Sequence, residues 1–113
     1  MVKHDFIPER GDIVSLEFTP QSGKEQAGIR PALVLSPKSY NQRVGLALFC
    51  PITKKKKGYP FEVELPKNMK TCGVILVDHI KSLDWRTCNA RFIEKLPNKE
   101  FLSVTDKIEL LLK

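Results

Sequence analysis

The sequence predicts a mainly β, α+β fold, in which a small barrel-like sheet carries a single C-terminal helix. Short apolar segments at strand-like spacing recur along most of the chain, whereas helical spacing occurs only at its end. A length of 113 residues suits one hydrophobic core. We therefore expect a single domain over residues 1–113.

The first two strands are expected on either side of a long polar segment. Residues 14–18 alternate apolar and polar side chains, which predicts a strand with one face in the core. Residues 19–29 hold a proline and two glycines among polar residues, and this length exceeds a tight turn. We expect a surface loop there. Arg30 then precedes an unbroken apolar run at 32–35, which is typical of a central strand.

Four more strands are expected further along the chain. Residues 44–52 predict the third, and residues 61–65 predict a fourth that shows two glutamates to water. Residues 74–77 form a buried apolar run typical of a fifth strand. Residues 90–93 predict a short last strand.

The C-terminal segment is expected to be one amphipathic helix. It follows Pro97, and Asn98 is a residue type that commonly caps helices. The apolar positions that recur at helical spacing are Phe101, Val104, Ile108, Leu111 and Leu112.

Composition excludes several classes of protein. Charged residues at 28% and hydrophobic residues at 42% are ordinary for a globular domain. No apolar run reaches membrane-spanning length, and the first residues lack the apolar core of a secretory signal. We expect a cytoplasmic protein that makes no contact with a membrane.

Cysteine and histidine are too few and too scattered for a metal site. Cys50, Cys72 and Cys88 fit neither a disulfide framework nor a zinc spacing, and we expect them to be reduced and mostly buried. Neither of the two histidines lies near a cysteine pair. The sequence therefore predicts no metal and no cofactor.

The positive charge is concentrated in one place. Residues 1–53 carry six Lys or Arg against five Asp or Glu, and residues 58–113 carry nine against eight. Most of the net charge of +6 therefore comes from Lys54, Lys55, Lys56 and Lys57. Such a patch favours an anionic partner such as nucleic acid, although a solvated lysine turn is the commoner explanation of a lysine run.

Three residues could act together on a phosphodiester. Glu25 could accept a proton while Arg30 grips phosphate oxygens, and the Thr53 hydroxyl would converge with them if its strand neighbours the Arg30 strand. The alternatives are a surface salt bridge between Glu25 and Arg30 and a turn-capping role for Thr53. Tyr59 beside the lysines could stack on a base or pack next to Pro60.

Five segments together resemble one family. They are RGDIVSLEF, EQAGIRPALVLSP, PIT, KGYPFEV and VILVDHIKSLDW, in this order and over nearly the whole chain. They resemble the MazF/PemK toxin endoribonucleases of type II toxin-antitoxin systems. The resemblance implies an SH3-like barrel of the PemK/CcdB type, a homodimer, an acidic antitoxin partner and metal-independent, sequence-specific cleavage of single-stranded RNA such as mRNA.

The family's catalytic residues correspond here to Glu25, Arg30 and Thr53. The resemblance implies that the ribose 2'-hydroxyl attacks its own phosphate, which leaves a 2',3'-cyclic phosphate and a 5'-hydroxyl. Ile29 stands where some relatives have histidine, so that histidine's acid or base role is absent here. We expect RNA contacts at Gln26, Gly28, Lys54, Lys55, Lys56, Lys57, Tyr59 and Lys81.

The sequence is also compatible with two other functions. A non-catalytic nucleic-acid-binding barrel would use the lysines for affinity, with Glu25 and Arg30 forming only a salt bridge. A relative of the same fold could instead poison a protein target such as a topoisomerase.

Overall fold

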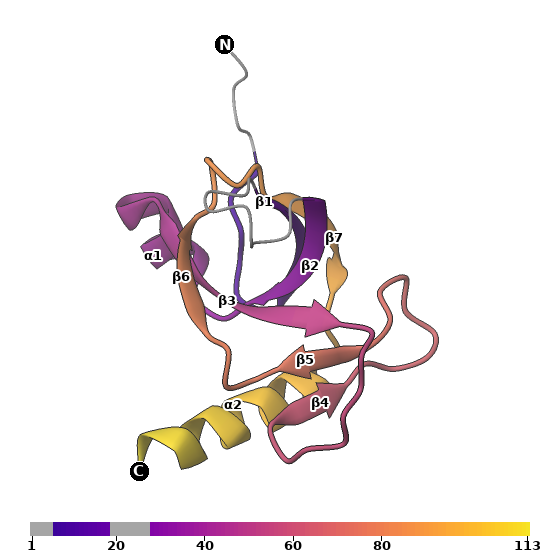
Figure 1. Ribbon diagram of the computed structural model, residues 1–113. Coiled ribbons are helices and arrows are strands. Elements are labelled where there is room, and N and C mark those ends of the chain that lie inside the picture. The colour runs from indigo at the N-terminus through magenta and orange to yellow at the C-terminus, as the bar shows by residue number, and fades with distance from the viewer. Residues whose placement is uncertain (1–5, 19–27) are drawn as a thin grey trace.

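The computed structural model describes residues 6–18 and 28–113 and shows an antiparallel sheet with one helix across one end (Figure 1). The fold class predicted from the sequence is confirmed. The path of paired strands in the described residues runs β4-β5-β3-β2-β1-β7, with β6 added beside β3, and does not close into a ring. The elements are β1 (Asp12–Phe18), β2 (Gly28–Val34), α1 (Lys38–Val44), β3 (Leu46–Thr53), β4 (Glu62–Glu64), β5 (Val74–Leu76), β6 (Lys81–Asp84), β7 (Arg91–Lys95) and α2 (Asn98–Leu112).

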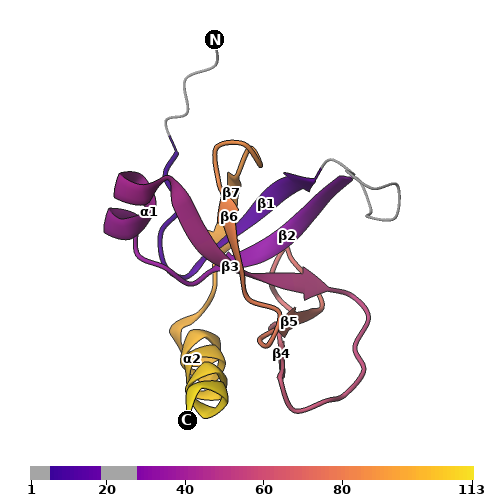
Figure 2. The same cartoon turned by 60° about the vertical axis from the view of Figure 1, so that its left-hand side comes forward.

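Strand β3 connects the two parts of the sheet. It pairs with β2 through Ala32 and Pro51, and its last two residues pair with β5 through Thr53 and Val74. Figure 2 shows β4 and β5 set apart from β1 and β2, with β3 leading from one pair to the other. The end of β3 therefore lies at the bend of the sheet.

Two apolar clusters hold the fold together. The first lies where α2 packs near β4 and β5, and it includes Ile13, Leu33, Ile75 and Val104. The second lies around the fully buried Phe49 and Trp85. Burying such side chains contributes about 2 kcal/mol each, so both faces of the central strands are fixed by packing. The expectation that residues 32–35 form a central strand is confirmed over Ala32, Leu33 and Val34.

Helix α1 was not expected from the sequence, which placed Val44 in a strand. The strand begins at Leu46 instead and continues past Pro51 to Thr53. The helix is short, and its one buried residue is polar. Asn41 donates to the carbonyls of Pro8 (2.7 Å) and Ser36 (3.0 Å), so tertiary hydrogen bonds stabilise a segment without apolar periodicity.

Strand β6 was also not expected. Its sequence KSLD is mostly exposed and carries no alternating core pattern. It becomes a strand because it pairs with β3 from Leu46 to Phe49. The last strand covers Arg91–Lys95, later than the expected residues 90–93.

The predicted cap of the C-terminal helix is wrong. Asn98 is the first helical residue, and the cap position belongs to Pro97, with no side-chain cap hydrogen bond. The Pro97 carbonyl accepts the Phe101 N–H at 3.1 Å. Pro97 has a φ of −57° and a ψ of 146°, so its backbone is not helical and the helix begins only after it. No helix in residues 6–18 and 28–113 has the length and apolar character needed to cross a membrane.

Candidate functional site

Arg30 lies inside strand β2, opposite Leu16 of β1. The strand starts at Gly28, so the expected loop ends before that residue and Arg30 is held by a ladder rather than at a strand entrance. The side chain is exposed, and no described residue forms an ion pair with it. A rigid backbone thus presents a guanidinium that is available to an anion.

A polar cavity of about 570 Å³ brings Arg30 and Thr53 together. Arg30 comes from β2, and Thr53 is the last residue of the neighbouring β3. Three cationic side chains line this cavity, and its lining contains no carboxylate from the described residues. An anion placed there would meet several positive charges at once. The lining residues are Ser15, Ile29, Arg30, Pro31, Ile52, Thr53, Lys54, Lys70, Thr71, Cys72 and Ile93.

Thr53 makes the turn contact that the sequence left open as an alternative. Its Oγ1 accepts the backbone N–H of Lys55 at 3.2 Å. A hydroxyl oxygen that accepts one hydrogen bond still carries a proton to donate. The two roles are therefore compatible, and the turn contact orients the hydroxyl at the bend of the sheet.

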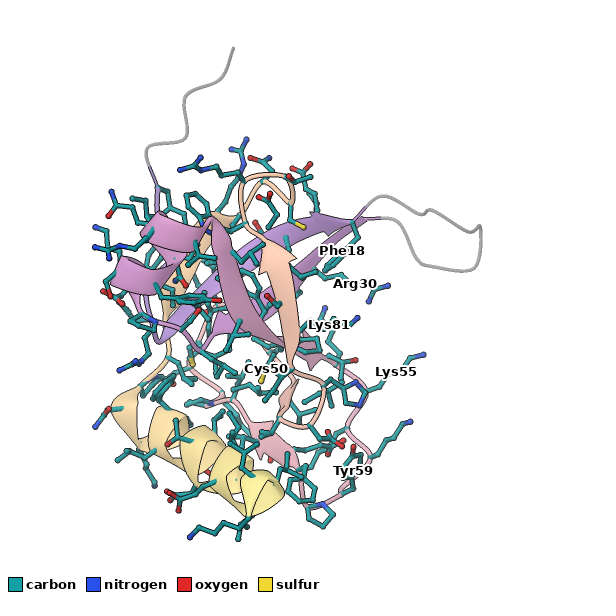
Figure 3. All side chains as sticks on the ribbon, turned by 90° about the vertical axis from the view of Figure 1, so that its left-hand side faces the viewer. Phe18, Arg30, Cys50, Lys55, Tyr59 and Lys81 are labelled. Carbon is teal, nitrogen blue, oxygen red and sulfur yellow. The ribbon has the colours of Figure 1, made fainter. Side chains whose placement is uncertain are left out.

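A second, apolar cavity of about 470 Å³ also includes Arg30. Its other cation is Lys81, at the start of β6, where it pairs with Phe49. Figure 3 shows Phe18, Arg30 and Lys81 along one side of the molecule. The apolar lining residues are Leu16, Phe18, Pro31, Ala32, Phe49, Pro51 and Leu83.

The four lysines lie on one segment, residues 54–60, which we call the lysine loop. All four side chains are exposed, but Lys56 forms an ion pair with Glu64 at 2.9 Å. The hydrogen bond that the Lys56 ammonium donates to the Glu64 carboxylate raises the pKa of Lys56. The Glu62 carboxylate accepts the backbone N–H groups of Lys57 (3.0 Å) and Gly58 (2.9 Å), so the loop is fixed at its far end.

Tyr59 is held by its own contacts. Its hydroxyl donates to Asp78, and this hydrogen bond raises the pKa of the phenol. Its ring meets Phe61 edge to face, with centroids 6.5 Å apart. Figure 3 places Tyr59 beyond Lys55, on the same side as Arg30. The contacts favour the packing role for Tyr59, one of the two that the sequence allowed.

Two of the expected residues lie outside the described part of the chain. They are Glu25 and Gln26, and their roles remain predictions from the sequence. Gly28 is the first residue of β2, opposite Phe18, and its φ of +127° is one that few other residues adopt. The structure thus brings Arg30, Thr53 and Lys54 to one cavity, and Arg30 and Lys81 to the other.

The segment that joins β4 to β5 also contributes to the site, which no sequence motif indicates. Lys70 and Cys72 of this segment line the polar cavity, although neither belongs to a motif. Cys72 is exposed, so the expectation of mostly buried cysteines holds fully only for Cys50. Burial raises the pKa of the Cys50 thiol to about 12. Among the residues described, no group of His, Cys, Asp or Glu side chains is arranged to hold a metal ion.

The chain is similar to known proteins of one family. Residues 9–112 match the family of PemK-like, MazF-like toxins of type II toxin-antitoxin systems. The chain is 41% identical over 107 residues to the endoribonuclease toxin MazF of Escherichia coli K12, covering 95% of this chain and 96% of that protein. It is 25% identical to Escherichia coli endoribonuclease PemK, covering 99% and 87%.

Solved structures show the same fold. MazF in a MazE-MazF crystal structure (Form-II) from Deinococcus radiodurans superposes with a TM-score of 0.91 at 49% identity, covering 96% of this chain and 97% of that chain. The family match over residues 9–112 spans the strands that carry Arg30 and Thr53 as well as α2. The chain therefore belongs to the PemK-like, MazF-like family of type II toxins.

Proposed function

We propose that this chain is the endoribonuclease toxin of a toxin-antitoxin pair and that it cuts single-stranded RNA, such as mRNA, at specific sequences without a metal ion. Family membership and the curated endoribonucleases that the chain resembles support the reaction class. The observation that carries the proposal is the polar cavity, where Arg30 and Thr53 from neighbouring strands meet further cations. A phosphodiester is the anion that such a site suits.

The proposed chemistry is a transesterification within the RNA. The ribose 2'-oxygen loses its proton to Glu25 and bonds to the adjacent phosphorus, and the bond from phosphorus to the 5'-oxygen breaks. The leaving oxygen takes up a proton, so the products are a 2',3'-cyclic phosphate and a 5'-hydroxyl. Arg30 stabilises the extra charge on the phosphorane, a contact of a kind worth about 3 to 4 kcal/mol. A guanidinium is a poor acid, so charge stabilisation is its main role.

The apolar cavity gives a reason for the preference for single strands. Unpaired bases expose their faces and edges, which can enter apolar cavities or stack on aromatic rings. Phe18 and Phe49 line this cavity, and Arg30 lies at both cavities. A base beside the cleaved phosphate would be read there.

The proposed partners follow from the same charges. A MazE-MazF complex is known for the Deinococcus radiodurans relative. An acidic antitoxin segment would lie across Arg30 and the lysine loop, since carboxylates can take the places of phosphates. We also propose a homodimer that acts in the cytoplasm.

Cleavage in the presence of a chelator tests the proposal. Purified protein is incubated with a long defined RNA and EDTA, and the ends of the fragments are mapped. We expect cuts at a few sequences, with 5'-hydroxyl ends that a polynucleotide kinase labels directly. RNA that is bound but stays intact would instead identify a non-catalytic nucleic-acid-binding protein.

A further inference from the structure

Residues 65–73 connect β4 to β5, and we call this segment the β4–β5 turn. In Figure 1 it projects beside β7 and the end of β3. It carries Lys70 into the lining of the polar cavity, where Arg30 and Thr53 also lie. The proposed site of cleavage is thus lined by this turn as well as by β2 and β3.

The carboxylate of Glu94 in β7 fixes the turn next to this cavity. One of its oxygens accepts the backbone N–H of Lys70 at 3.1 Å, and the other accepts that of Thr71 at 2.7 Å. At the base of the turn, the N–H of Leu65 donates to the carbonyl of Gly73 at 3.0 Å. The backbone at Lys70 is therefore held from a separate strand.

The Lys70 ammonium is available to a ligand. Its side chain is exposed, and none of the ion pairs of residues 6–18 and 28–113 involves it. Glu94 lies near it, but the Glu94 carboxylate accepts the backbone N–H groups of Lys70 and Thr71 and forms no ion pair with the Lys70 ammonium. Among the described residues, the lining of the cavity contains no carboxylate that could pair with Lys70.

We propose that Lys70 is a further phosphate-binding residue of this site and that Glu94 is the positioning residue that holds it there. Arg30 takes the phosphate that is cleaved, and Lys70 takes a neighbouring phosphate of the same strand. The two cations come from separate segments, β2 and the β4–β5 turn, so they fix the direction in which the RNA crosses the cavity. This inference rests on the proposed function.

The test locates the phosphate that Lys70 binds. The probe is an RNA oligonucleotide that spans a cleavage site mapped with the wild-type protein and has a 2'-deoxy nucleotide at the cut, so that it binds without being cleaved. A series of such probes replaces one phosphate at a time by a neutral methylphosphonate. Affinity is measured for the wild-type protein, Lys70→Ala, Glu94→Gln and Lys67→Ala.

Lys67→Ala is the matched control. Lys67 lies on the same turn and is also exposed, but it does not line the cavity. We expect Lys70→Ala to weaken binding roughly tenfold, the lower end of what a hydrogen bond to a charged group contributes. The slope of log K against log salt should decrease by about 0.7, the value for one phosphate contact on a single strand. Lys67→Ala should leave both quantities unchanged.

Replacing one phosphate by a methylphosphonate weakens binding where the protein contacts that phosphate, and we call this loss of affinity the methylphosphonate penalty. The decisive result is that one such penalty disappears in a variant. In the wild type, one linkage next to the cut should weaken binding when it is made neutral, and this penalty should disappear in Lys70→Ala. Glu94→Gln should reduce the same penalty and leave the others intact, which a general loss of stability would not do. Circular dichroism of each variant checks that the fold is retained.

Two outcomes would overturn the inference, and they differ. If wild-type protein binds and cuts RNA but Lys70→Ala keeps every penalty, Lys70 binds no phosphate, while the proposed function stands. If wild-type protein neither binds nor cuts any of the RNAs, the proposed function fails and this inference fails with it.

Discussion

Gly73 and the carbonyl oxygen of Thr53 lie so close that a Cβ added to Gly73 would be 2.2 Å from that oxygen. Its φ is +121°, a conformation that residues with side chains rarely adopt. The β4–β5 turn therefore packs directly on the backbone of Thr53. A side chain at position 73 would have to displace either the β4–β5 turn or the backbone of Thr53.

Gly73→Ala should impair both stability and cleavage. We expect it to lower the free energy of unfolding by about 1 to 3 kcal/mol, the usual cost of a strained backbone position. Cleavage should fall further than this loss explains, because Thr53 moves. Urea titration and single-turnover cleavage below the melting temperature measure the two effects.

Gly45→Ala is the control for the glycine prediction. Gly45 also has a positive φ, of +82°, but nothing lies within 4 Å of an added Cβ. This variant should lose stability from backbone strain and keep its cleavage rate once folded. Equal cleavage rates for Gly73→Ala and Gly45→Ala would show that cleavage does not depend on the position of the Thr53 backbone.

Arg30→Ala should reduce kcat by roughly 100- to 1000-fold, as for other residues that stabilise transition-state charge. The melting temperature should stay near that of the wild type, because the Arg30 side chain is exposed and has no ion pair with a described residue. Arg30→Lys should recover only part of the rate, since an ammonium lacks the planar pair of donors. A large fall in melting temperature would indicate a structural arginine instead.

The lysines of the lysine loop should contribute unequally to RNA binding. Lys55→Ala should reduce the salt slope of binding by about 0.7, because this side chain is exposed and forms none of the ion pairs of the described residues. Lys56→Ala should have a smaller effect, since Glu64 already neutralises that ammonium at 2.9 Å. Fluorescence anisotropy with a 2'-deoxy probe measures both slopes. Equal slopes for both variants would contradict a role for the ion pair.

Acid should destabilise the fold in part through Asp84. Backbone hydrogen bonds from Thr87 and Arg86, both 3.0 Å, hold the pKa of this carboxyl below its usual 3.8. A lowered pKa in the folded state stabilises the protein above the unfolded value, and this contribution is lost as pH falls below it. We expect unfolding free energy to fall between about pH 5 and pH 2, and to fall less steeply in Asp84→Asn.

The comparison with Asp84→Asn separates this residue from the others. Glu9 and Glu94 also have lowered pKa values, so acid will weaken the variant too. The variant should be less stable than the wild type near neutral pH. Plots of the free energy of unfolding against pH for the two proteins should converge in acid. Parallel curves would show that Asp84 titrates alike in the folded and unfolded chains.

The sequence by itself determined the central strands, the C-terminal helix and the family. Alternation at 14–18 and the apolar runs at 32–35 and 74–77 predict strands because their burial follows from local pattern alone. Arg30, Thr53 and the lysines were found in the same way, since they stand in recognisable motifs. The place of Glu25 still rests on the sequence alone.

Only the tertiary structure decided what lies around those residues. Helix α1 and strand β6 carry little apolar pattern. The helix is held by the hydrogen bonds of Asn41, and the strand forms by pairing with β3. Lys70 reaches the polar cavity because Glu94, distant in sequence, fixes its turn. The periodicity of apolar residues shows which side chains of a segment are buried. A contact between two distant segments leaves no such periodicity in either sequence, so only the tertiary structure reveals it.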